Sequence, residues 1–168
     1  QNTSVEDMNA GRVCTLSALI LKGCEAHILH VGDSRIYRVT AKSLEPLTTD
    51  HRMVLSAVES YLGRAIGAAP QVEVDYAHLP IRAGDVFLLT TDGVHDVIDA
   101  ATVQLALAQD TLDAAARALA DMALERGSTD NLTVQFVRVD HLAQTTASLD
   151  LDLADLSVPP LPQSGTVL

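Results

Sequence analysis

Three apolar, strand-like segments each have an aspartate directly at one end, and this feature constrains the fold more than any other. "LHVGDS" ends at Asp33, "LLTTDG" contains Asp92, and "TDNLTV" begins from Asp130. An acid that ends one strand and an acid that begins an antiparallel neighbour lie at the same edge of a sheet. The pattern therefore predicts an antiparallel sheet that gathers carboxylates at one edge.

Such a cluster of carboxylates is unfavourable unless cations lie among them. Carboxylate oxygens suit Mg(II) or Mn(II), and two such ions about 3.5–4 Å apart would activate a water for attack on phosphorus. Asp96 lies four residues after Asp92, so a helical turn between them would direct both side chains the same way and hold a further ion. The alternative is that Gly-Asp-Ser and Thr-Asp-Gly are ordinary turns. That alternative suits one aspartate taken alone, whereas three at strand ends favour a metal site.

The remaining pattern indicates antiparallel strands followed by helices. Residues 50–66 differ, because Met53, Ala57 and Tyr61 are four apart and predict a short helix inside an irregular segment. The other expected elements are strands at 13–21, 25–31, 34–39, 43–48, 71–79, 85–91 and 130–139, and helices at 101–109 and 111–127. Val72, Val74 and Tyr76 alternate with polar residues, which predicts a half-buried strand, while the continuous apolar run at 85–91 predicts a strand covered on both faces.

Length and charge argue against several classes of protein. The 168 residues allow one domain, expected over 1–140, followed by a flexible acidic, Pro-containing linker or tail over 141–168. The net charge of −11 repels nucleic acid and anionic lipid. No apolar run approaches the ~20 residues of a membrane-spanning helix, and "QNTSVEDMNAGR" does not resemble a signal peptide. We therefore expect a cytoplasmic protein, in which Cys14 and Cys24 are buried free thiols.

Five motifs between about Val13 and Val139 resemble those of one protein family. They are "HVGDSRIYRV", "LTTDH", "LGRAIG", "GDVFLLTTDGVHDVI" and "STDNLTVQFV". In this order and spacing they resemble the motifs of the bacterial PPM-type, or type 2C, metal-dependent serine/threonine protein phosphatases. The resemblance implies an α+β fold, a four-layer sandwich of two antiparallel β-sheets flanked by helices, with the first strands of the fold missing from this chain.

The resemblance also implies a binuclear Mn(II) or Mg(II) centre at one edge of the sandwich. Asp92 and Asp130 match the family's ligands to the two catalytic ions, and Asp33 and Asp96 match positions that bind a third ion. The segment from about Asp50 to Gly63 matches a mobile flap beside the site.

Two histidines lie close to these aspartates in the sequence. His51 is a candidate for donating a proton to the leaving group, with a cap at the protein surface as the alternative. His95 lies between Asp92 and Asp96 and is a candidate for tuning the site, with no functional role as the alternative. Arg35 and Arg64 lie within the motifs, and we expect a structural ion pair or a backbone contact for each.

Enzymes of this family hydrolyse phosphoserine and phosphothreonine in phosphoproteins by attack of a metal-bridging hydroxide. The family also uses an arginine that holds phosphate and an Asp-Gly pair that bridges the metals, both from strands that would precede Val13. We therefore expect weak or no turnover from these 168 residues alone, and activity from the intact gene product. The segment "VPPLPQSG" resembles a linker to a C-terminal serine/threonine kinase domain, which is a further predicted partner.

Two other functions remain open at this point. One is a non-catalytic phosphatase-like module for binding or regulation, and the other is a phosphohydrolase of the same fold that acts on small phosphoesters. The retained aspartates favour catalysis, because a module that only binds has no need to concentrate negative charge.

Overall fold

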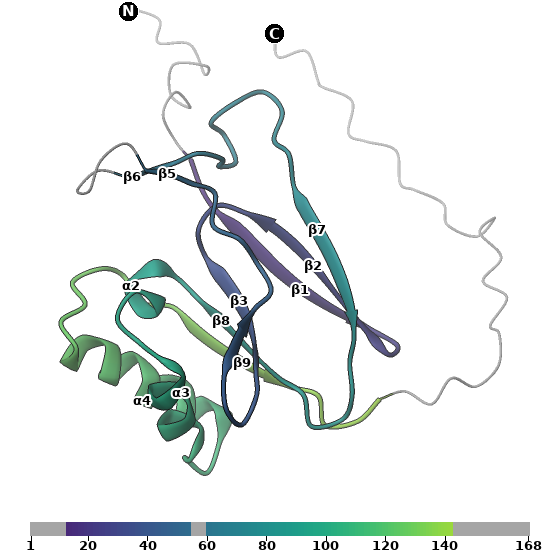
Figure 1. Ribbon diagram of the computed structural model, residues 1–168, viewed down its shortest axis with the longest axis vertical. Helices are drawn as coiled ribbons and strands as arrows, with labels where there is room; N and C mark the ends of the chain where they lie inside the picture. Colours follow the sequence, from purple (N-terminus) through teal and green to yellow (C-terminus); the bar gives the residue numbers. More distant parts are fainter. Residues whose placement is uncertain (1–12, 55–59, 143–168) are drawn as a thin grey trace, which may run out of the picture.

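The computed structural model describes residues 13–54 and 60–142, and the statements below concern these ranges. They contain two antiparallel sheets, a separate two-stranded ribbon and three helices (Figure 1). The first sheet has the strand order β1-β2-β7, with β1 at Leu16–Lys22, β2 at Glu25–Val31 and β7 at Asp75–Pro80. The expected tail over 141–168 lies almost entirely outside the described residues.

The second sheet and the helices come mainly from the C-terminal half of the described chain. The sheet has the order β4-β3-β8-β9, with strands at Leu44–Pro46, Arg35–Val39, Val86–Thr90 and Val134–Arg138 respectively. The helices are α2 (Asp92–His95), α3 (Ala100–Leu107) and α4 (Leu112–Glu125). The backbone N–H groups of Thr102 and Ala114 donate to the side chains of Asp99 and Thr111, which therefore cap α3 and α4. None of the helices in the described ranges is both long and apolar enough to cross a membrane.

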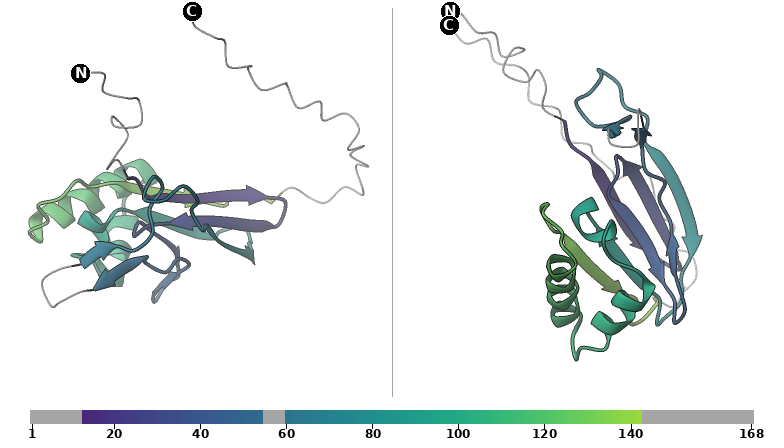
Figure 2. Two further views of the ribbon diagram at one scale, coloured as in Figure 1. Left: turned by 90° about the horizontal axis from the view of Figure 1, so that it is seen from above. Right: turned by 60° about the vertical axis from the view of Figure 1, so that its left-hand side comes forward.

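The second sheet lies between the helices and the first sheet, as Figure 2 shows from two sides. Phe87 of β8 packs in one core with Ala26 of the first sheet, whereas Leu88 packs in the other core with Leu119 of α4. Adjacent residues of a strand point to opposite faces, so the apolar run of β8 is buried on both sides as predicted. The described residues thus form three layers, with helices on one outer face.

The expected helix within 50–66 is wrong for the residues that the structure describes. Arg52–Val54 (β5) and Ser60–Leu62 (β6) form an antiparallel two-stranded ribbon, the β5–β6 ribbon, in which Met53 lies opposite Tyr61. Strand pairing brings these two residues together without a helical turn. Ala57, the third residue of the predicted stripe, lies outside the described residues.

Two expectations about burial are also wrong. Tyr76 is 59% exposed and Val74 is exposed as well, so the alternation at 71–79 does not mark a buried face. The strand there begins only at Asp75 and forms an edge of its sheet, with no described layer over its outer face. Cys14 and Cys24 are free but exposed, because Cys24 lies in the β1–β2 turn and Cys14 precedes the edge strand β1.

Candidate functional site

The strand register of the second sheet brings three of the predicted aspartates to one edge. The start of β3 lies opposite the end of β8, and the end of β8 lies opposite the start of β9. Asp33 shortly precedes β3, Asp92 shortly follows β8, and Asp130 lies a few residues before β9. Their positions at strand ends therefore place them together, as the sequence pattern predicts.

The turn that carries Asp92 packs directly against the segment that carries Asp130. Thr91 Oγ1 donates to the carbonyl of Asn131 at 3.2 Å and accepts from Thr133 N at 3.0 Å. A Cβ atom at Gly93 would lie 2.7 Å from the Asn131 carbonyl oxygen and 3.1 Å from Asp130 Cβ. Only glycine allows this close approach of the two motifs, which explains the Asp-Gly pair at the end of β8.

The turn before Asp33 also depends on a glycine. Gly32 has a φ of 113°, and a Cβ atom there would collide with the side chain of Thr15. Its backbone N–H donates to His51 Nδ1 at 3.1 Å, and its carbonyl accepts from His51 N at 2.7 Å. These bonds hold His51, which directly precedes the β5–β6 ribbon, beside the turn that carries Asp33.

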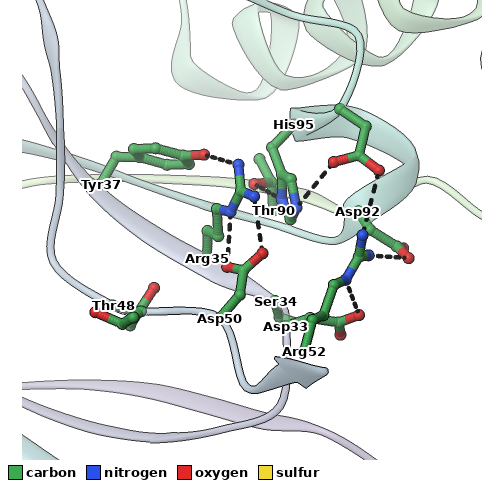
Figure 3. Close-up of polar contacts among 12 residues, drawn as sticks. Asp33, Ser34, Arg35, Tyr37, Thr48, Asp50, Arg52, Thr90, Asp92 and His95 are labelled. Carbon is green, nitrogen blue, oxygen red and sulfur yellow. Dashed lines mark hydrogen bonds and ion pairs between the residues drawn. The ribbon is translucent and has the colours of Figure 1, made fainter. Parts of the chain in front are cut away.

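Three of the aspartates, Asp33, Asp92 and Asp96, form an acidic cluster around the guanidinium of Arg52 (Figure 3). Arg52 Nε donates to Asp33 Oδ2 at 2.9 Å, and Nη2 donates to Asp92 Oδ2 at 2.8 Å. Nη1 lies 3.7 Å from Asp96 Oδ2. One arginine of the β5–β6 ribbon thus joins the turn before β3 to both ends of α2.

Arg52 is positively charged at any physiological pH, and the acidic cluster raises its pKa further. Burial by itself lowers the pKa of this guanidinium, but the hydrogen bond to Asp33 and the charges of Asp33, Asp96 and Asp92 outweigh burial and raise the pKa. A permanent positive charge therefore lies among the carboxylates, where the sequence pattern calls for a cation. The cation is supplied by the chain itself.

Asp130 is beside the acidic cluster but does not share Arg52. Its Oδ1 accepts from the backbone N–H of Asn131 at 2.7 Å, and among the described residues it forms no ion pair. This bond to the amide of the next residue is local, which fits the alternative of an ordinary turn for this aspartate. The structure therefore gathers three of the four predicted metal-site residues on one guanidinium and places the fourth against the neighbouring backbone.

His51 lies in the protein interior, so the alternative of a cap at the surface is wrong. It is 8% exposed. Its Nδ1 accepts from Gly32 N, so the proton is on Nε2, which lies 2.9 Å from Asp75 Oδ2. Both ring nitrogens are thus engaged away from the acidic cluster, which leaves no free donor for a leaving group in this arrangement.

His95 lies behind the acidic cluster with its side chain only 1% exposed. Its Nδ1 is 3.2 Å from Thr90 Oγ1, while Nε2 has no hydrogen-bond partner within residues 13–54 and 60–142 and lies 3.6 Å from Asp96 Oδ1. Burial, helped by the charge of Arg35, lowers the pKa of His95 despite the nearby carboxylates. A neutral imidazole therefore faces Asp96 from the protein interior.

Arg35 and Arg64 form the structural ion pairs expected for them. Arg35 donates through Nε and Nη2 to both carboxylate oxygens of Asp50, each at 2.8 Å, and through Nη1 to Tyr37 Oη at 3.2 Å. Arg64 Nη1 lies 2.8 Å from Asp75 Oδ1. The hydrogen bond from Arg35 lowers the pKa of Asp50, outweighing burial, so the pair stays charged and holds the chain before β5 against β3.

Comparison with known proteins gives a consistent result. No family model matches the chain. The serine/threonine protein phosphatase PstP of Mycobacterium tuberculosis is 30% identical over 139 residues, which cover 74% of this chain and 27% of PstP. The serine/threonine phosphatase stp of Listeria monocytogenes is 31% identical over 150 residues, which cover 80% of this chain and 59% of that protein.

Solved structures give the same family. The crystal structure of the M. tuberculosis phosphatase PstP/Ppp matches with a TM-score of 0.71 at 28% identity, covering 82% of this chain and 64% of that one. The catalytic domain of PstP in complex with two manganese ions matches with a TM-score of 0.65 at 29% identity, covering 77% and 60%. The chain is a homologue of the bacterial PPM-family serine/threonine phosphatases. It has the PPM phosphatase fold and spans about a quarter to three fifths of the length of these curated relatives.

The acidic cluster fits the metals of a PPM phosphatase in donor chemistry but not in its present arrangement. Carboxylate oxygens are the ligands that Mg(II) and Mn(II) prefer. In the described part of the chain, however, no group of three or more His, Cys, Asp or Glu side chains is arranged to hold a metal ion. The Oδ2 atoms of Asp33 and Asp92 both bond Arg52, so an ion that binds these oxygens has to compete with the guanidinium.

Sequence reasoning missed Arg52, the residue on which the acidic cluster is centred. In the sequence, the one sign of a role for Arg52 is that it directly follows the motif "LTTDH". It lies in the segment that resembles the family's flap. The partners of Arg52 lie 19 and 40 residues along the chain. Such contacts follow from the fold and not from local spacing.

Proposed function

We propose that the protein is a metal-dependent serine/threonine protein phosphatase that hydrolyses phosphoserine and phosphothreonine in phosphoproteins in the cytoplasm. Its homologues are serine/threonine protein phosphatases. The proposal assigns metal binding to Asp33, Asp92, Asp96 and Asp130. It concerns the intact gene product.

The observation that carries the proposal is the convergence of Asp33, Asp92 and Asp96 on one positive group. These side chains come from two separate turns, and Asp130 lies against Gly93 at the same edge. Concentrating acids in this way lowers stability unless a cation is bound. A site built for cations at the edge of a PPM fold is what a metal-dependent phosphatase requires.

Divalent ions bound there would lower the pKa of water and neutralise charge on the phosphoryl group. The chain's own residues hold the aspartates in place for this task. Gly93 allows the Asp92 and Asp130 segments to touch, and Gly32 with His51 fixes the turn that carries Asp33. His95 lies behind Asp96, with its Nε2 3.6 Å from Asp96 Oδ1.

A second candidate function is a phosphatase-like module that binds partners without catalysis. The ion pairs of Arg52 favour it, because a guanidinium among the acids satisfies them without metal. Metal binding separates the two candidates. A purely structural cluster would stay closed on Arg52 at any manganese concentration.

The test is manganese-dependent release of phosphate from phosphoserine and phosphothreonine peptides by the full-length gene product. We expect activity that is lost with EDTA and that falls about a hundredfold or more in Asp92→Asn, because a charged ligand is removed from the site. Asp113→Asn is the matched control, since Asp113 is an exposed aspartate of α4 whose ion pair with Arg117 lies away from the site. Activity unchanged in Asp92→Asn would overturn the proposal. Hydrolysis of small phosphoesters but not of phosphopeptides would show that small phosphoesters are the substrate class.

A further inference from the structure

The guanidinium of Arg52 bonds two carboxylate oxygens that a divalent ion could also use. It bonds Oδ2 of Asp33 and Oδ2 of Asp92 at 2.9 and 2.8 Å. A cation coordinated to either oxygen would lie within a few ångströms of the guanidinium, and like charges at that distance repel strongly. The guanidinium and a divalent ion therefore compete for these two carboxylates.

The net charge of the acidic cluster shows why it can bind a cation of higher charge than Arg52. Three carboxylates face one guanidinium, and the third, Asp96, is held only at 3.7 Å. The net charge of the group is therefore −2 when all its members are ionised, before Asp130 is added. A single arginine leaves the cluster undercompensated, so a divalent ion is attracted even while Arg52 is in place.

Arg52 can leave the acidic cluster without breaking a large sheet. It lies on β5, which pairs only with β6 and with neither of the two main sheets. The ribbon segment is closed at its base, where Gly63 N donates to the His51 carbonyl at 2.6 Å. The long side chain of Arg52 can swing away by rotation, with or without movement of the ribbon on this base.

We propose that Arg52 is a competing cation that holds the acidic cluster closed in the metal-free protein and is displaced when Mn(II) or Mg(II) binds. This inference rests on the proposed function, since it concerns the same site. Metal binding then releases Arg52 from Asp33 and Asp92 and frees a guanidinium on the β5–β6 ribbon. Metal occupancy of the acidic cluster is thus coupled to the contacts that the β5–β6 ribbon makes.

The experiment compares manganese affinity, measured by electron paramagnetic resonance of free Mn(II), in the full chain and its variants. Arg52→Gln removes the charge and should bind Mn(II) about tenfold more tightly than the wild type, because the competitor is gone. Arg52→Lys keeps a positive charge at this position, and its manganese affinity should stay close to that of the wild type. Arg117→Gln, which removes an exposed arginine of α4, is the matched control and should change nothing.

Thermal unfolding supplies a second measurement that does not depend on activity. In EDTA, Arg52→Gln should unfold at a lower temperature than the wild type, because its carboxylates repel one another without a counter-charge. Saturating Mn(II) should remove this difference. A purely structural arginine would instead lower the unfolding temperature equally with and without metal.

Separate results contradict the inference and the proposed function. Equal or weaker manganese binding by Arg52→Gln would overturn the inference, as would equal tightening by Arg52→Lys. If Asp92→Asn still weakens manganese binding in that case, the proposed metal site stands. If Asp92→Asn binds Mn(II) as the wild type does, the proposed metal site fails and the inference fails with it.

Discussion

Arg52 Nη2 lies 2.8 Å from Asp92 Oδ2, although the two residues are 40 positions apart in the chain. This contact links the β5–β6 ribbon to the turn at the end of β8. It also explains how an apolar strand can run directly into carboxylates, because a positive group lies among them. The same carboxylates remain able to bind a metal ion once that group moves.

The three aspartates around Arg52 should contribute unequally to the stability of the metal-free protein. The Asp33 side chain is 14% exposed and directly hydrogen-bonded to Arg52, whereas the Asp96 side chain is 51% exposed and 3.7 Å away. We expect Asp33→Asn to lower the free energy of unfolding in EDTA by about 1–2 kcal/mol and Asp96→Asn by less than about 0.5 kcal/mol. Urea unfolding measures both, and an equal loss would contradict this assignment of the contacts.

Gly93→Ala should damage both stability and metal binding. The added methyl group would lie 2.7 Å from the Asn131 carbonyl oxygen, so the Asp92 and Asp130 segments must move apart. We expect a loss of about 1–3 kcal/mol in the free energy of unfolding, together with weaker manganese binding. Gly23→Ala is the control, because Gly23 also has positive φ but has no atoms within 4 Å of the added Cβ. Gly23→Ala should lose stability and keep its manganese affinity.

The pair of Arg35 and Asp50 should make stability depend on pH in the acidic range. The pKa of Asp50 is held below its ordinary value of 3.8 by the hydrogen bond from Arg35. A lowered pKa in the folded state means that this stabilisation is complete above pH 3.8 and is lost as the pH falls through the lowered value.

Asp50→Asn isolates this contribution from those of other carboxylates. We expect the difference in the free energy of unfolding between wild type and variant to be about 1–2 kcal/mol near pH 6 and to shrink below pH 3.8. Denaturant unfolding at several pH values is the measurement. A difference that does not change with pH would show that the charge of Asp50 is not what stabilises the fold.

The sequence predicts the second sheet well and the ribbon poorly, for physical reasons. The sequence signal of β8 is strong because its apolar run is buried on both faces. The shared edge of the acids at strand ends follows directly from antiparallel pairing. Met53 and Tyr61 predict a helix because a spacing that suits one helical face also arises when a hairpin pairs the same residues.

Contacts that join distant segments could not be predicted from local patterns. The sequence pattern indicates that carboxylates gather and need a cation, yet nothing near Arg52 in the chain shows that its guanidinium meets Asp33 and Asp92. The buried position of His51 likewise depends on Gly32 and Asp75, which come from other elements. These contacts appear only when the sheets are assembled.

The most direct test of the account is to locate manganese by anomalous scattering in crystals of the full-length protein grown with Mn(II). The account predicts ions coordinated by Asp92 and Asp130 at the shared edge of the second sheet, with Arg52 withdrawn from Asp92. A crystal structure in saturating Mn(II) that has Arg52 still bonded to Asp92 and no manganese coordinated by either aspartate would contradict it.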